Sequence, residues 1–221
     1  MMNSLRNLRF GVPLSMLLLV IGCGQGPKEA DNPWPPAFSW LEQGAVTPAK
    51  DQGPFGTCGV FAAMGVTESL VLRASGRTLD LSEQHYLNAS DTWVETGVNP
   101  GMVFAFIRDH GVVVESRLPY EGQRTGTLPE GEPDVRLSSF GSLALGSLPP
   151  EERRHRLKEL LSTYGPVAVV MDMLSDLRGY RGGLYIPGSS ATGDTGHWVV
   201  LVGWQDDPGM PNGGCWVVKN S

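Results

Sequence analysis

The chain has 221 residues, of which 41% are apolar and 18% charged, and its formal net charge is −6. This length suits one domain, with room for two lobes that share a core, and the composition is too apolar for wholesale disorder. Because the net charge is negative, the sequence shows no basic surface that would bind nucleic acid, so we expect no nucleic-acid partner.

The first 22 residues are predicted to be a signal peptide. Arg6 and Arg9 precede an apolar run that contains Pro13 and is too short for a comfortable membrane span. The run ends in VIGC at Cys23, which resembles the lipobox of bacterial lipoproteins. That resemblance implies cleavage before Cys23, lipidation of its thiol and anchoring to the membrane of a bacterial cell envelope. An ordinary signal peptide with a chance cysteine is the alternative.

A tether is predicted next, because residues 23–36 are rich in proline and glycine, and a folded domain is expected over 37–221. Its first part shows helical patterns. An apolar stripe with three-to-four spacing ends before Gly76, a candidate C-cap, and Ser82 is a candidate N-cap for the next helix. The four helices are expected over residues 57–74, 81–90, 101–111 and 149–165.

Strands are predicted in the last third of the chain. Four short segments, rich in β-branched and aromatic residues, are separated by turns that contain glycine. Because helices come first and strands second, the fold class is predicted to be α+β, with a cleft between a helical half and a sheet half. The strands are expected at PVAVVMDM, GLYI, HWVVLVGW and CWVVKN, residues 166–173, 183–186, 197–204 and 215–220.

Cys58 lies at the start of the first helix, after a glycine-rich approach. The dipole and unpaired N–H groups of a helix N-terminus favour a thiolate, which indicates a nucleophile. A small apolar residue of the core is equally compatible with this position. Cysteine arithmetic also leaves open a disulfide between Cys58 and Cys215.

A thiol nucleophile needs a base and polar partners, and three residues elsewhere in the chain are candidates. His197 opens a strand beside a flexible loop, and Asn220 ends the next strand, which suits an amide that orients an imidazole. Gln52, six residues before Cys58, could donate to the same space. Taken singly, His197 is better explained as a capped strand-end residue and Asn220 as a turn residue, and Gln52 could be an exposed loop residue. The histidines show no metal-ligand spacing, so we expect neither metal nor cofactor.

Taken together in this order, these stretches are similar to papain-like cysteine proteases over residues 37–221. The resemblance rests on GAVTPAKDQG before the cysteine, on LSEQ and PYEG, and on the strands that carry His197 and the final WVVKNS. It implies a two-lobe α+β fold, in which a central helix carries the cysteine and the second lobe is an antiparallel β-barrel-like sheet. It also implies a monomer that cleaves peptides or proteins.

The resemblance further implies individual roles. Cys58 matches the nucleophile, His197 its ion-pair partner and general acid, Asn220 the residue that orients the ring, and Gln52 the oxyanion donor. Gly101 matches a glycine whose backbone pairs with substrate. The residues that fall near the pocket for the second residue before the cut are Met102, Val103, Val170, Gly196 and Trp198.

Three features depart from the family pattern. Gly59 replaces an aromatic residue, which is expected to loosen the packing beside the thiol. Phe55, Ser90 and Val98 stand where disulfide cysteines are expected, and Phe55 could contact Val98 instead of a bond. The chain ends at Ser221, where the family continues, so we expect a C-terminally incomplete domain. A catalytically impaired binding module and a cell-wall peptide amidase or transpeptidase are the alternative functions.

Overall fold

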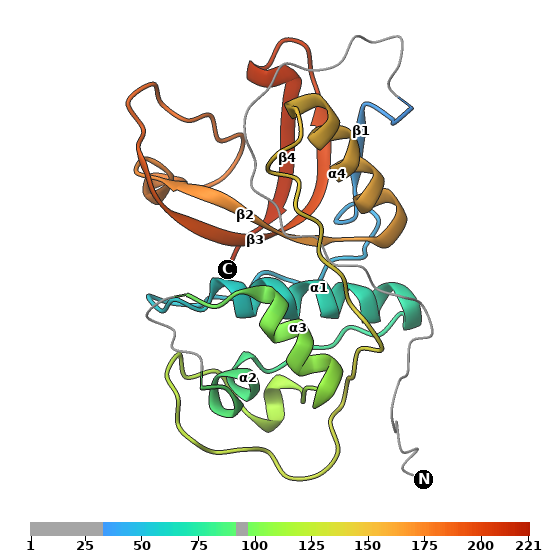
Figure 1. The fold of residues 1–221 in the computed structure, drawn as a ribbon, viewed down its shortest axis with the longest axis vertical. Coiled ribbons are helices and arrows are strands. Elements are labelled where there is room, and N and C mark those ends of the chain that lie inside the picture. Colours follow the sequence, from blue (N-terminus) through green and yellow to red (C-terminus); the bar gives the residue numbers. More distant parts are fainter. Residues whose placement is uncertain (1–32, 92–96) are drawn as a thin grey trace.

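Helix α1 (Cys58–Ser75) lies between a helical lobe and a sheet lobe (Figure 1). The computed structural model describes residues 33–91 and 97–221. The predicted signal peptide, Cys23 and residues 23–32 of the predicted tether lie outside the described residues. The architecture is α+β, with a central helix and an antiparallel sheet, as the resemblance implied.

The central helix is buried over most of its surface, because it packs against both lobes. Every residue from Gly59 to Ser69 is buried, well beyond the apolar stripe visible in the sequence. The helix ends as predicted at Gly76, whose left-handed φ of 69° lets its N–H donate to the Leu72 carbonyl. By length and composition α1 could cross a membrane, but 67% of it is buried within the protein, as in a core helix.

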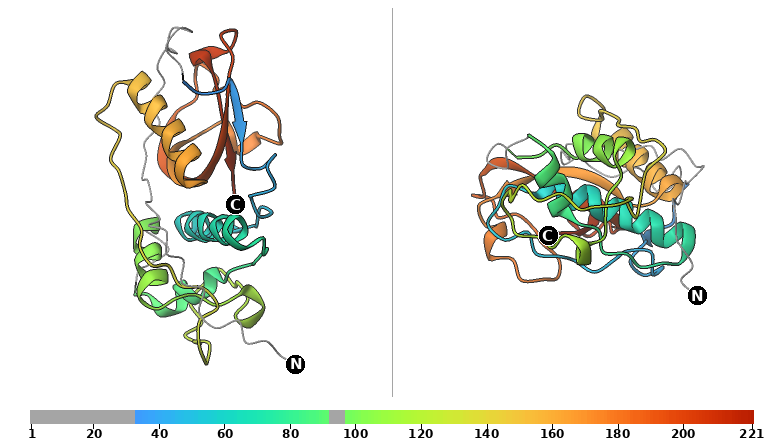
Figure 2. Two further views of the ribbon diagram at one scale, coloured as in Figure 1. Left: turned by 90° about the vertical axis from the view of Figure 1, so that its right-hand side faces the viewer. Right: turned by 90° about the horizontal axis from the view of Figure 1, so that it is seen from below.

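The other predicted helices are present, and local capping explains where they begin. Ser82 caps α2 by accepting a hydrogen bond from the His85 N–H at 3.1 Å. Asn99 caps α3 in the same way, accepting from the Gly101 N–H at 2.8 Å. These helices are α2 (Glu83–Ala89), α3 (Pro100–Asp109) and α4 (Pro150–Tyr164). Figure 2 shows α2 and α3 on one side of α1 and α4 with the sheet on the other.

The sheet is antiparallel and centred on its longest strand, β3. The first part of β3 pairs with β2, and its last part pairs with β1. On the other edge of β3, β4 pairs with the middle and the C-terminal end of β3. The strands are β1 (Ala37–Ser39), β2 (Val167–Leu174), β3 (Gly193–Asp206) and β4 (Gly214–Lys219).

The prediction of a strand at GLYI, residues 183–186, is wrong. This segment lies in the long loop between β2 and β3 and forms no ladder. Its aromatic side chains bond within the loop instead: the Tyr185 hydroxyl donates to Asp176, and the Tyr180 hydroxyl donates to the Gly183 carbonyl. Aromatic content alone therefore does not distinguish this loop from a strand.

The start of the described chain packs on the sheet. The Trp204 indole donates to the Pro35 carbonyl at 3.0 Å, and the Asp206 N–H donates to the Pro36 carbonyl at 2.6 Å. Trp34 also lies edge-on against Trp204. The last residues of the predicted tether therefore contribute to the sheet lobe.

Candidate active site

The helix N-terminus presents Cys58 at the junction of the two lobes. Cys58 is the first residue of α1 and is half-buried. A methyl group added to the next residue, Gly59, would lie 1.8 Å from the Val98 carbonyl oxygen and 3.2 Å from Pro100. The expectation that Gly59 loosens the packing is therefore wrong, since the backbone at Val98 fills the space that a side chain would need.

The structure brings Cys58, His197 and Asn220 together from α1, β3 and the end of β4. His197 and Cys58 share a side-chain hydrogen bond. The Nε2 of His197 lies 2.6 Å from Oδ1 of Asn220. Because a carbonyl oxygen only accepts, Nε2 carries the hydrogen, and Nδ1 is left to exchange a proton with the thiol.

Electrostatics in this site favour an ion pair. Burial raises the pKa of Cys58, but hydrogen bonds from His197 and the Trp198 backbone, with the charge of the ring, outweigh burial and lower the pKa. The hydrogen bond with Cys58 raises the pKa of His197; burial opposes this, and the bond with Asn220 adds to it. The helix dipole acts on the thiolate in the same direction. Both shifts act in the direction of a thiolate that faces an imidazolium.

Gln52 lies in the loop before α1 and reaches the same region. Its Oε1 accepts from the Ser221 hydroxyl at 2.8 Å, and its Nε2 donates to the Phe55 carbonyl at 2.7 Å. One of the two amide hydrogens is therefore already engaged within the loop. The bond with Ser221 ties this loop to the residue that follows Asn220.

Tyr120 holds the loop from its other side. Its hydroxyl donates to the Gln52 carbonyl at 2.9 Å, so the Thr57 hydroxyl, at 2.8 Å, must be the donor in the second bond. The ring of Phe55 lies edge-on to Tyr120 and directly over Gly122, where a methyl group would be 2.0 Å from it. This aromatic contact fixes the loop that carries Gln52.

The positions expected for disulfides and for a Cys58–Cys215 bond hold no bridge. Cys58 and Cys215 are both free thiols. Phe55 packs on Tyr120, whereas Val98 is 1% exposed and packs in the core next to Gly59. Phe55 and Val98, which occupy positions expected for cysteines, therefore pack against different neighbours.

The predicted substrate-binding residues differ in how they are placed. Val170 pairs with Trp198 across β2 and β3, and both are half-buried, while Gly196 is exposed. Met102 is 49% exposed, but Val103 is fully buried in the core. The Gly101 N–H already donates to Asn99, so pairing of this group with a substrate would require opening of the α3 cap.

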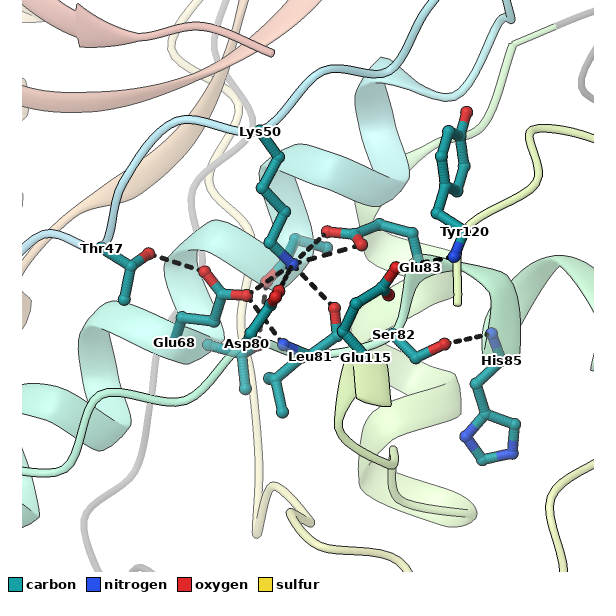
Figure 3. A network of polar contacts seen from close by, with 12 residues as sticks. Thr47, Lys50, Glu68, Asp80, Leu81, Ser82, Glu83, His85, Glu115 and Tyr120 are labelled. Atoms are coloured by element: carbon teal, nitrogen blue, oxygen red, sulfur yellow. Dashed lines mark hydrogen bonds and ion pairs between the residues drawn. The ribbon is translucent and has the colours of Figure 1, made fainter. Parts of the chain in front are cut away.

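A cluster of charges near the site, with Glu68 and Glu83 buried and Asp80 exposed, was not predicted from the sequence (Figure 3). Lys50 contacts Glu68 at 2.8 Å, Asp80 at 2.6 Å and Glu83 at 2.9 Å. Burial would lower the pKa of Lys50, but the Glu83 and Glu68 carboxylates raise it, so the lysine is charged. Glu68 interrupts the apolar residues of α1, and that interruption was the signal in the sequence.

The chain resembles known proteins along its whole described length. A family model for papain family cysteine proteases matches residues 34–221. A viral cathepsin of Heliothis zea nuclear polyhedrosis virus is 32% identical over 192 residues, which cover 85% of this chain and 48% of the relative. Procathepsin L of Felis catus is 31% identical over 193 residues, 85% of this chain and 56% of the relative.

A solved structure agrees with these relatives. Digestive procathepsin L 3 of the Tenebrio molitor larval midgut aligns with a TM-score of 0.69 at 27% identity, covering 98% of this chain and 64% of that one. The chain spans about half the length of the relatives it matches. The family match, by contrast, extends over most of this chain, so the chain belongs to the papain family of cysteine proteases.

Proposed function

We propose that this protein is a cysteine-type peptidase that hydrolyses peptide bonds through a thioester. The observation that carries the proposal is the hydrogen-bonded series Cys58–His197–Asn220, with Cys58 at a helix N-terminus. The three groups lie on separate elements, and a binding module has no physical need to bring them together.

The reaction begins with attack of the Cys58 thiolate on the carbonyl carbon of a peptide. The developing oxyanion is stabilised by the Cys58 N–H and by the second amide hydrogen of Gln52. His197 then gives its Nδ1 proton to the leaving amine, and a thioester remains on the sulfur. Water activated by the now neutral His197 hydrolyses the thioester. Asn220 keeps the ring in the plane that serves both steps.

A peptide substrate and a thiol-directed trap test the proposal. Purified protein is incubated with a fluorogenic peptide, and the acyl-enzyme is trapped by acid and located by mass spectrometry. We expect hydrolysis in the wild type, a thioester on Cys58, and loss of both in Cys58→Ala. Cys215→Ala is the matched control, because Cys215 is a free thiol on β4 with no role in the proposal. Hydrolysis that survives Cys58→Ala would overturn the proposal.

We also propose that the protein is lipidated at Cys23 and held at a bacterial cell envelope. The support is the basic and apolar pattern of residues 1–22 followed by VIGC. Incorporation of an alkyne-labelled fatty acid in a bacterial host tests this. The label should be present in the wild type and absent in Cys23→Ser, and equal labelling of both would contradict the assignment.

A further inference from the structure

The carboxylate of Glu68 is fully buried on α1, ten residues after Cys58. One of its oxygens accepts from Lys50 at 2.8 Å. The other accepts from the Thr47 hydroxyl at 2.6 Å and lies 3.7 Å from Lys219. Thr47 in turn accepts from Lys219 at 2.9 Å. Figure 3 shows Lys50 and Thr47 converging on this carboxylate.

The two lysines lie next to groups of the active site along the chain. Lys50 is two residues before Gln52, and Lys219 immediately precedes Asn220. With consecutive Cα atoms about 3.8 Å apart, holding either lysine restricts its neighbour to a small volume. The Glu68 carboxylate, on the helix that carries Cys58, therefore fixes the positions of the Gln52 and Asn220 segments relative to that helix.

The cluster also adjoins the active site through space. A cavity of about 10 Å³, close to the least that holds one water molecule, is lined by residues of both. Its lining includes Lys50, Glu68, Lys219, Asn220 and Ser221. Apolar side chains such as Phe61, Trp198 and Val200 line the rest of this cavity, so Asn220 and the charged cluster border the same small space.

Glu68 also accepts a hydrogen bond from the buried Leu81 N–H at 2.9 Å, but this contact gives no reason for the two lysines at this place. Removing ions from water costs free energy, and replacing a buried ion pair by apolar residues of similar volume is often neutral or stabilising. Neighbouring positions of α1, such as Met64 and Val71, show that apolar side chains pack well on this helix. What paired charges add is a unique register, because each group has one arrangement that satisfies it.

We propose that Glu68 is a positioning residue: through Lys219 it fixes Asn220 and hence the His197 ring, and through Lys50 it fixes the Gln52 loop. This inference rests on the proposed function. Glu68 itself does not touch the substrate. Its loss should alter the geometry of the thiolate–imidazolium pair in a protein that remains folded.

The test compares Glu68→Gln and Lys219→Met with the wild type. Two properties are measured: the pH dependence of Cys58 alkylation by iodoacetamide, and kcat and KM on a peptide. Lys158→Met is the matched control, because it removes a lysine that is 1% exposed from an ion pair with Asp206 in the sheet lobe. Urea unfolding shows that each variant is folded.

We expect both test variants to be alkylated about tenfold more slowly than the wild type at about pH 6, with the profile displaced to higher pH. We also expect kcat to fall about tenfold while KM changes by less than about twofold, because misplaced catalytic groups affect the chemical step. Lys158→Met should match the wild type in both measurements even if its unfolding free energy falls.

The outcomes separate the two proposals. A wild-type thiol that reacts only at alkaline pH would overturn the proposed function. If the wild type reacts at low pH and Lys219→Met keeps its profile and kcat, the positioning role is refuted. If Glu68→Gln does not fold, Lys219→Met decides. If neither variant folds while Lys158→Met does, the positioning role is refuted as well, because the cluster is then a requirement of folding.

Discussion

Gly59→Ala tests how closely the Val98 backbone packs against α1 beside Cys58. Alanine is favoured over glycine inside a helix by about 1 kcal/mol, so with room for a methyl group the change would stabilise the protein. The structure leaves no room, since the new Cβ would lie 1.8 Å from the Val98 carbonyl oxygen. Ordinary contact begins at 3.4 Å, so α1 or the Val98 segment must move by the difference, about 1.6 Å.

Overpacking costs about 1–3 kcal/mol, and a clash of this size with backbone belongs in the upper part of that range, about 2–3 kcal/mol, which exceeds the gain in helix propensity by about 1–2 kcal/mol. We therefore expect Gly59→Ala to lower the unfolding free energy by about 1–2 kcal/mol in urea titrations. Because Cys58 is the adjacent residue, kcat/KM should fall about tenfold or more.

Gly65→Ala is the matched control on the same helix. Its Cβ would meet a Val200 methyl group at 3.2 Å, which can yield by a few tenths of an ångström, and the Lys219 Nζ at 3.4 Å, which is an ordinary contact. This variant should stay within about 1 kcal/mol of the wild type. A Gly59→Ala protein as stable as Gly65→Ala would refute the reasoning.

Three further predictions concern the site and its surroundings. Asn220→Ala should lower the pKa of His197, because the hydrogen bond raises it, so the alkaline limb of the kcat/KM profile should move to lower pH; an unmoved limb would contradict this. Burial and the nearby Glu68 outweigh the opposing charge of Lys50 and raise the pKa of Glu83 to about 8. The contribution of Glu83 to stability is therefore lost as pH rises toward that value, so the unfolding free energy of Glu83→Gln should improve relative to the wild type between about pH 4.5 and about pH 8 in urea titrations. A difference that is constant with pH would rule this out. Tyr120→Phe removes the donor to the Gln52 carbonyl, so kcat should fall while the alkylation rate of Cys58, which needs no oxyanion donor, stays the same; equal loss of both would show a general disturbance.

Local signals were sufficient for much of the fold. Gly76 and Ser82 end and begin helices because each satisfies backbone groups within its own turn, so their roles are visible in the sequence. The loop around Tyr185 was not predictable, since it has the composition of a strand, and its contacts within the loop, such as that of Tyr185 with Asp176, are not visible in composition. Strand β1 is three residues long and depends on pairing with β3, which no local pattern reveals.

The site shows the same division. The order of Cys58, His197 and Asn220 along the chain indicated the reactive groups, and the structure brings them together. The effect of Gly59 was misjudged, because the backbone that fills its side-chain space comes from Val98, 39 residues later in the sequence. Local sequence patterns therefore do not reveal contacts between residues that are far apart in the chain.

The most direct measurement of the central claim is the alkylation rate of Cys58 against pH, followed by mass spectrometry of the intact thiols. Cys215, a free cysteine on β4, serves as the reference within the same molecule. If a thiolate faces an imidazolium, Cys58 should be labelled rapidly at about pH 5.5, where an ordinary thiol with a pKa of about 8.5 is almost inert. Labelling of Cys58 and Cys215 at the same rate across the acidic range would contradict the account.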